Sequence, residues 1–164
     1  MQLQSLDLNG IVVEVLELMH SELIQRRVFA ESQLAPSLPW VSVDRVQLQQ
    51  VLLNLIVNAC EAMPAEHPGE LRLTIVTALT DEGAVRLSIT DIGSGIPEGQ
   101  IDRVFEPFVT SKEHGVGLGL TICRSIVAAH GGRLWAVNNP EGGATFHLEL
   151  SAAVPETGSD AVSS

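Results

Sequence analysis

Three groups of residues in this chain have side chains or backbone freedom that could do chemistry. Asn54 and Asn58 are amides four residues apart, a spacing that places both on one face of a helix. Asp91 is a carboxylate followed directly by a glycine-containing turn at 92–97. The glycine-rich run 115–119 opens a helical pattern, where free backbone N–H groups suit phosphates. Each group alone also has an ordinary structural explanation.

The two amides lie on a helix predicted for 44–63, which Asp44 caps and Pro64 stops. Apolar residues cover most of its circumference, which is typical of a helix buried in a core. A thin polar stripe runs through that apolar surface and consists of Gln47, Gln50, Asn54, Asn58 and Glu61. An unpaired buried amide costs about 1–3 kcal/mol, so either the protein itself or a ligand must pair these groups. The helix alone does not decide between a structural polar network and a binding site.

Asp91 ends a predicted strand, 84–91, that pairs antiparallel with 71–79 across a turn. Alternation along the strand places Asp91 on one face with three aliphatic residues, Val85, Leu87 and Ile89. A carboxylate that points toward a core needs a hydrogen-bonding partner, or its pKa rises and it becomes neutral. A core salt bridge is the structural alternative, but few cations lie nearby in the sequence.

The glycine run at 115–119 does not belong to the common phosphate-binding motifs. The chain has no Gly-x-x-x-x-Gly-Lys-Ser/Thr loop, and the run lacks both the preceding strand and the spacing of a dinucleotide-binding fold. It also contains no His-Glu-x-x-His or paired Cys-x-x-Cys metal motif. By itself the run is therefore weak evidence for a phosphate site.

In order and spacing, these groups resemble the catalytic, ATP-binding domain of sensor histidine kinases, within the GHKL ATPase superfamily. The resemblance covers 6–150. A nitrogen box matches 54–59, a first glycine box 91–97, a phenylalanine box 105–108 and a second glycine box 115–119, and 143–146 matches the closing strand. Four ordered boxes are specific together. The runs Glu-Ala-Met at 61–63 and Phe-Val-Thr-Ser-Lys at 108–112 most resemble the nitrogen-regulation and oxygen-sensing branch.

The resemblance implies a role for each matching residue. Asp91 would accept a hydrogen bond from the adenine amine, and Gly95 would let the backbone approach the base. Asn58 would ligate Mg²⁺, and Asn54 would contact the metal or the phosphates. Lys112 would neutralise the γ-phosphate. The catalytic residues implied by the resemblance would thus be Asn54 and Lys112. The other implied nucleotide-binding residues are Gly93, Ile96, Phe108, Gly115, Val116, Gly117, Leu118, Gly119 and Thr145, the last through water.

The implied activity is donation of the γ-phosphate of Mg·ATP to a histidine on a separate dimerisation domain, with a response regulator downstream. None of the five histidines has the setting of that phosphoacceptor, so we expect it outside this chain; they are His20, His67, His114, His130 and His147. Two other classes stay open: an ATP-hydrolysing machine, which in related families has a glutamate at the position of Asn54, and a non-catalytic nucleotide-sensing module.

The elements that would position these residues form an α+β fold: a two-layer α/β sandwich of the GHKL (Bergerat) type. We expect a mixed, mostly antiparallel sheet on three main helices, with a mobile ATP lid at 93–115. Expected helices are 10–28 with Asn9 as the cap, 44–63, a short one at 98–104, and 116–129. Expected strands are 6–8, 29–34, 40–43, 71–79, 84–91, 133–137 and 144–150. The catalytic domain would span 1–151, and 152–164 would be a flexible tail or linker.

Composition limits the partners. A formal net charge of −11 argues against nucleic acid, because nucleic acid rewards basic patches. The longest apolar run falls far short of the ~20 residues that span a bilayer, so we expect no direct membrane contact and a cytoplasmic location. The two cysteines, Cys60 and Cys123, lie in apolar helical patterns and are expected to be buried thiols.

Overall fold

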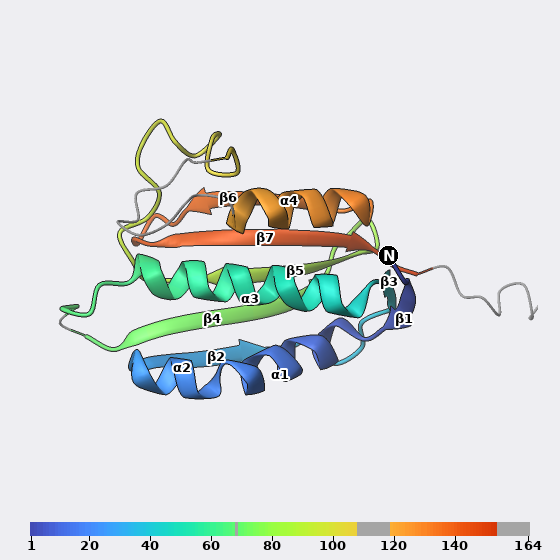
Figure 1. Cartoon of the computed structure of the whole chain (residues 1–164), viewed down its shortest axis with the longest axis horizontal. Coiled ribbons are helices and arrows are strands. Elements are labelled where there is room, and N and C mark those ends of the chain that lie inside the picture. Colours follow the sequence, from blue (N-terminus) through green and yellow to red (C-terminus); the bar gives the residue numbers. More distant parts are fainter. Residues whose placement is uncertain (68, 108–118, 154–164) are drawn as a thin grey trace, which may run out of the picture.

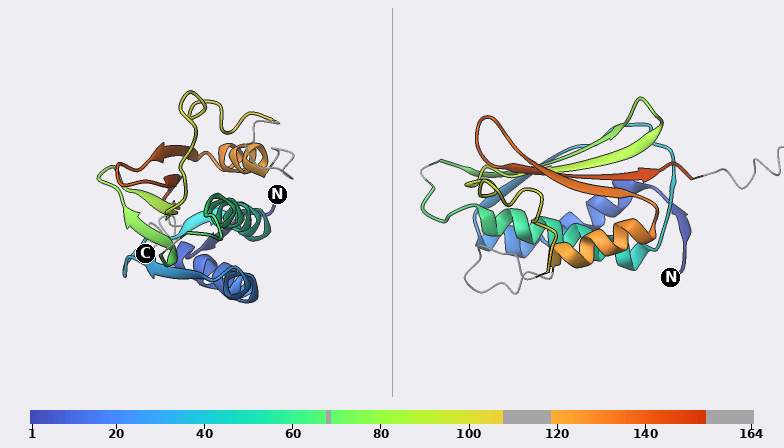
Figure 2. Two further views of the ribbon diagram at one scale, coloured as in Figure 1. Left: turned by 90° about the vertical axis from the view of Figure 1, so that its left-hand side faces the viewer. Right: turned by 90° about the horizontal axis from the view of Figure 1, so that it is seen from above.

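The computed structural model describes residues 1–67, 69–107 and 119–153. Its elements form two layers, with the helices on one face of a sheet (Figures 1 and 2). The described helices are α1 (Leu8–Leu18), α2 (His20–Gln25), α3 (Arg45–Ala62) and α4 (Gly119–Ala129). The described strands are β1 (Gln4–Leu6), β2 (Val28–Gln33), β3 (Val41–Val43), β4 (Leu71–Leu79), β5 (Ala84–Thr90), β6 (Arg133–Asn138) and β7 (Ala144–Ser151).

The main sheet has five strands in the order β2-β4-β5-β7-β6. Only β2 and β4 run parallel, and the other three pairs are antiparallel. A parallel pair needs a long crossover, which here contains β3 and α3. The prediction of a mixed, mostly antiparallel sheet in a two-layer sandwich is therefore confirmed.

A second, two-stranded sheet pairs β1 with β3 near the start of α3, with Gln4 opposite Val43. Val41 also bridges to Ala152, which ties the end of the main sheet to this small one. His130, at the end of α4, accepts a hydrogen bond on Nε2 from the Asp44 backbone N–H at 3.0 Å. The start of α3 is thus joined to β1, to β3 and to the end of α4.

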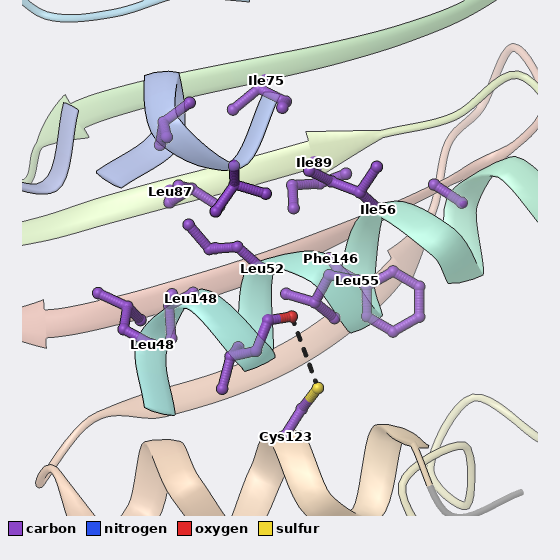
Figure 3. Close-up of a cluster of buried hydrophobic side chains, with 14 of the residues drawn as sticks. Leu48, Leu52, Leu55, Ile56, Ile75, Leu87, Ile89, Cys123, Phe146 and Leu148 are labelled. Atoms are coloured by element: carbon purple, nitrogen blue, oxygen red, sulfur yellow. Dashed lines mark hydrogen bonds between the residues drawn. The ribbon is translucent and has the colours of Figure 1, made fainter. Parts of the chain in front are cut away.

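The core lies between the sheet and α3. This helix runs lengthwise over the middle of the sheet, with α1 and α2 on one side of it and α4 on the other (Figure 1). Strand side chains alternate, so Leu87 and Ile89 of β5 and Phe146 and Leu148 of β7 meet Leu52, Leu55 and Ile56 of α3 (Figure 3). On the α4 side, the buried Cys123 thiol donates to the Val51 carbonyl oxygen at 3.7 Å. Both cysteines are buried free thiols, as predicted.

The N-terminal region differs from the prediction by small shifts. Asp7, not Asn9, caps α1: its Oδ1 accepts the Asn9 N–H at 3.1 Å, so β1 ends at Leu6. The predicted single helix is interrupted at Met19 and ends at Gln25. It cannot continue to 28, because Arg27 has φ +59° and turns the chain into β2.

The predicted short helix at 98–104 is wrong. The segment consists of successive turns, in which Gln100 N–H bonds to Pro97 O and Arg103 N–H bonds to Gln100 O. Gly99 has φ +88°, a conformation that interrupts a right-handed helix. Within the described ranges, no helix is both long enough and apolar enough to cross a membrane.

Replacing Leu52 by alanine tests whether α3 organises the core. Leu52 is 1% exposed, so we expect Leu52→Ala to lower the free energy of unfolding by about 2–5 kcal/mol. Val46→Ala on the same helix is the matched control, because Val46 is 71% exposed and should change stability by less than about 0.5 kcal/mol. Urea unfolding of both variants measures the difference, and equal losses would contradict this assignment of the core.

Candidate nucleotide site at the end of strand β5

Asp91 lies directly after β5 and is 1% exposed, on the core side of the sheet as the alternation predicted. Its Oδ1 accepts hydrogen bonds from the Gly93 N–H at 2.8 Å and the Ala144 N–H at 3.4 Å. Its own N–H donates to the Ala144 carbonyl oxygen at 3.0 Å. Both bonds to the carboxylate end on Oδ1, and no described cation forms a salt bridge with it. The core salt bridge is thus excluded for the described residues.

Burial raises the pKa of the Asp91 carboxyl above its usual value, and the N–H groups of Gly93 and Ala144 partly oppose that rise. The folded protein therefore holds this proton more tightly than the unfolded chain does. The stability that the protonated Asp91 carboxyl contributes is therefore lost as the pH rises from the usual carboxyl pKa through the raised one. A buried carboxyl kept at such a cost is typical of a functional site.

Two glycines let the backbone pass close to Asp91. A Cβ on Gly93 would lie 2.1 Å from the Ala62 carbonyl oxygen, at the end of α3. A Cβ on Gly143, which has φ +81°, would lie 2.1 Å from the Asp91 carbonyl oxygen. Side chains are therefore excluded at both positions. The end of α3, the turn after β5 and the start of β7 meet around one carboxylate.

Asn138, the last residue of β6, holds the glycine turn from the other side. Its Oδ1 accepts the Ile96 N–H at 2.7 Å, and its Nδ2 donates to the Ile96 carbonyl oxygen at 3.0 Å. Gly95 lies beside it with φ +83°, and a Cβ there would be 2.9 Å from Asn138 Oδ1. Asn138 was not predicted as a site residue, because an exposed amide at a strand end carries no periodic or motif signal.

The amide pair lies on the central helix, and both side chains are partly buried. Burial raises the pKa of the Cys123 thiol to about 11, and a hydrogen bond with the Asn54 side chain opposes this rise. Asn54 therefore faces α4. Asn58 follows one turn later, nearer to Ala62 and Gly93. Among the described residues, no three His, Cys, Asp or Glu side chains gather as metal ligands.

Thr145 is on the other face of the sheet from Asp91. Its neighbours Ala144 and Phe146 are buried toward the core, and its hydroxyl donates to Asn139 Oδ1 at 2.7 Å and pairs with the Thr90 hydroxyl at 2.9 Å. The structure therefore does not bring the Thr145 side chain to Asp91. Ala144 is the residue that reaches the carboxylate, through its backbone N–H.

The loop after β5 is attached to α4 at Phe105. The Phe105 ring meets Phe146 edge to face with centroids 5.9 Å apart, and the Arg124 guanidinium lies 5.0 Å from its centroid. Thr121 Oγ1 donates to the Phe105 carbonyl oxygen at 2.7 Å. The predicted residues Phe108, Lys112, Gly115, Val116, Gly117 and Leu118 lie outside the described residues, as does most of the second half of the predicted lid. Gly119 begins α4, and open space surrounds the position of a Cβ there.

These features fit an adenine nucleotide. A base with an exocyclic amine needs a buried acceptor and nearby backbone without side chains. Asp91 supplies the acceptor, and Gly93 and Gly143 supply the backbone. The amides at 54 and 58 lie on α3, the helix whose end meets Gly93, and their neutral oxygens suit a Mg²⁺ ion held chiefly by phosphates and water.

Comparison with known proteins agrees with this geometry. The family model for histidine kinase-, DNA gyrase B- and HSP90-like ATPases matches residues 43–154. The chain belongs to this family of ATP-binding domains. The residues matched by the family model include every described residue of the site around Asp91.

Relatives narrow the family to sensor kinases. The sensor protein FixL of Bradyrhizobium diazoefficiens is 44% identical over 129 residues, which cover 79% of this chain and 25% of that protein. The sensor histidine kinase ZraS of Escherichia coli (strain K12) is 36% identical over 148 residues, or 90% of this chain and 31% of that protein. The predicted resemblance to the nitrogen-regulation and oxygen-sensing branch of sensor histidine kinases is thus confirmed. This chain spans only about a quarter to a third of these relatives.

Solved structures give the same result. The catalytic domain of histidine kinase ThkA matches with a TM-score of 0.80 and 31% identity, covering 93% of this chain and 97% of that domain. ThkA in complex with the response regulator protein TrrA matches with a TM-score of 0.74 and 30% identity, covering 92% of this chain and 42% of that one. The chain therefore has the fold of a histidine kinase catalytic domain.

Replacing Asp91 by asparagine tests the cost of the buried charge. At neutral pH we expect Asp91→Asn to raise the free energy of unfolding of the nucleotide-free protein, because the amide oxygen still accepts the two N–H groups without a buried charge. The gain should shrink as the pH falls through the raised pKa of the wild-type carboxyl. Urea unfolding across a pH series measures it.

Asp44→Asn is the matched control, since backbone N–H groups of Gln2 and Gln47 lower the pKa of Asp44. There the same chemical change should reduce stability above the usual carboxyl pKa, and the loss should fade as the pH drops. A loss of stability in Asp91→Asn at neutral pH would contradict the conclusion that burial raises the pKa of Asp91.

Proposed function

We propose that this chain binds Mg·ATP and donates the γ-phosphate to a histidine on a separate dimerisation domain, as the catalytic half of a sensor kinase. The observation that carries the proposal is the buried carboxylate of Asp91, against which the backbone at Gly93 and Gly143 packs closely. Glycine keeps side chains away from this stretch of backbone, and the carboxylate is an acceptor for the amine of a base.

In this proposal the adenine amine donates to the Asp91 carboxylate, whose Oδ1 is already engaged by Gly93 and Ala144. The backbone at Gly95 and Ile96 borders the base. An ionised acceptor makes a stronger hydrogen bond than a neutral one, so nucleotide binding recovers part of the cost of burying this charge. A guanine base presents a carbonyl where adenine has its amine, and its oxygen would face the Asp91 oxygen.

The phosphate end of the nucleotide would lie along α3 toward the start of α4. Asn58 and Asn54 are assigned as the metal-side amides, and Mg²⁺ would supply charge neutralisation for the phosphates. We also assign Phe108, Lys112 and the backbone N–H groups of 115–119 to the phosphate side, on the sequence resemblance alone. Thr145 has no part in this proposal, because its hydroxyl bonds to Asn139 on the face of the sheet away from Asp91.

Asn54 favours phosphotransfer over hydrolysis. Transfer to water needs a group that orients or deprotonates the water, and an amide has no basic site near neutral pH. A histidine acceptor can bring its own neighbouring base, so the P–O bond to ADP breaks and the P–N bond to imidazole forms without a base from this chain. The named sensor kinases among the relatives support this choice. The downstream partner would be a response regulator, as in the complex of ThkA with TrrA.

Mixing experiments with radiolabelled ATP test the proposed reaction. We expect very slow ATP turnover by the chain alone and no self-labelling. A cognate dimerisation domain added in trans should acquire acid-labile, base-stable phosphohistidine. Asn58→Ala should reduce this labelling by about 10²-fold or more if the amide holds the metal, since displaced reacting groups cost rates of that order.

Gln49→Ala is the matched control on the same helix, because Gln49 donates to Glu14 on the α1 side, away from the pocket. It should label the partner at the wild-type rate. Brisk ATP hydrolysis by the isolated chain without any histidine labelling would show that the kinase assignment is wrong.

A further inference from the structure

The Asn138 side chain makes the kind of contact that a neighbouring strand would make. Its carboxamide accepts from the Ile96 N–H at 2.7 Å and donates to the Ile96 carbonyl oxygen at 3.0 Å. Ile96 lies in the turn after β5, outside any strand, so these bonds replace a backbone ladder at this point. β7 lies between β6 and β5, so the Asn138 side chain reaches past the start of β7 to this turn.

The turn is thereby fixed at two points. Asp91 Oδ1 holds it at Gly93 with a bond of 2.8 Å, and Asn138 holds it at Ile96. Ser94 and Gly95 lie between these anchors. Gly95 has φ +83°, and a Cβ there would lie 2.9 Å from Asn138 Oδ1 and 3.5 Å from the Gly143 carbonyl oxygen. The same amide that fixes Ile96 therefore also limits Gly95 to glycine.

We propose that Asn138 is a positioning residue for nucleotide binding: its carboxamide holds the 93–96 backbone in the shape that borders the base. This inference rests on the proposed function, because it assumes that the base binds beside Asp91. A turn that is already ordered loses less conformational entropy when the ligand arrives. Asn138 touches no reacting atom, so it should affect the binding of ATP and not the rate of transfer.

Both Asn138 bonds are exposed to solvent, which separates local from global effects. Exposed hydrogen bonds contribute little to overall stability, whereas the order of one turn depends on them directly. Loss of the Asn138 side chain should therefore loosen the turn without unfolding the domain.

The test compares Asn138→Ala with the wild type by amide hydrogen exchange and by calorimetric titration with Mg·ATP. In the nucleotide-free protein, the Ile96 amide should exchange about 3- to 10-fold faster in the variant, while core amides of β5 and β7 stay unchanged. The dissociation constant for ATP should rise by a similar factor of about 3- to 10-fold. In transfer to a dimerisation domain, KM for ATP should rise while kcat stays the same.

Asn138→Asp separates the two bonds, because it keeps an oxygen for the Ile96 N–H and removes the donor to the Ile96 carbonyl. Its Ile96 amide should stay protected, and its ATP affinity should lie between those of the wild type and Asn138→Ala. Asn139→Ala is the matched control: an adjacent amide in the same hairpin that bonds to Thr145 and not to the turn. It should leave Ile96 exchange and ATP affinity at wild-type values.

Asp91→Asn, measured in the same experiments, separates a failure of the proposed role of Asn138 from a failure of the proposed function. If it loses ATP affinity while Asn138→Ala keeps wild-type affinity and Ile96 exchange, the role of Asn138 is overturned and the proposed function stands. If Asp91→Asn keeps full ATP affinity, the proposed function fails, and this inference fails with it. Equal effects of Asn138→Ala and Asn139→Ala would also overturn the inference, since only a general change in the hairpin would remain.

Discussion

The carboxylate of Asp91 is the group on which the rest of the site depends. It is 1% exposed at the end of the central strand β5, and it accepts backbone N–H groups from the turn after β5 and from the start of β7. Water is excluded, so these two bonds are the means by which the folded protein tolerates the charge. Each neighbouring backbone segment must therefore come close, and glycine occupies the points of closest approach.

The helices also take part in this close approach to Asp91. α3 ends at Ala62, whose carbonyl oxygen lies against Gly93, so the helix terminus closes the pocket from one side. α4 contacts α3 along its length, and Cys123 joins the two through Val51 O and the Asn54 side chain. The end of α3 beside Gly93 and the amide pair are thus held in place by the same packed helices that form the core.

Much of this arrangement follows from local sequence signals. Alternation along 84–91 placed Asp91 correctly, and the apolar surface of 44–63 identified the buried helix. The predictions of helix boundaries were wrong where a single residue decides between two conformations of similar energy. Asp7 outcompetes Asn9 as a helix cap, because Asn9 turns to Ala35 O and Thr77 Oγ1 instead. Gly99 breaks a short helical pattern through its positive φ.

Two features of the site depend on tertiary contacts that no local pattern records. Hydrogen bonds with Thr90 and Asn139 show that the Thr145 side chain lies on the face of the sheet away from Asp91. The sequence motif that contains Thr145 does not predict that face. The bond between Asn138 and Ile96 joins residues 42 positions apart in the chain. Hydrophobic periodicity and sequence motifs relate residues that are close in the sequence. They do not predict a hydrogen bond from a side chain to a distant segment of backbone.

The pocket is assembled from three segments that are far apart in sequence: the end of α3, the turn after β5 and the β6–β7 hairpin. No partly folded form that lacks one of them can present the same carboxylate and the same glycine backbone. Ligand therefore binds only to the complete domain, and mass action converts occupancy into resistance to unfolding: a ligand at 100 times its dissociation constant adds about 2.7 kcal/mol. Inside a cell, bound nucleotide would therefore lower the population of the incompletely folded states that proteases recognise.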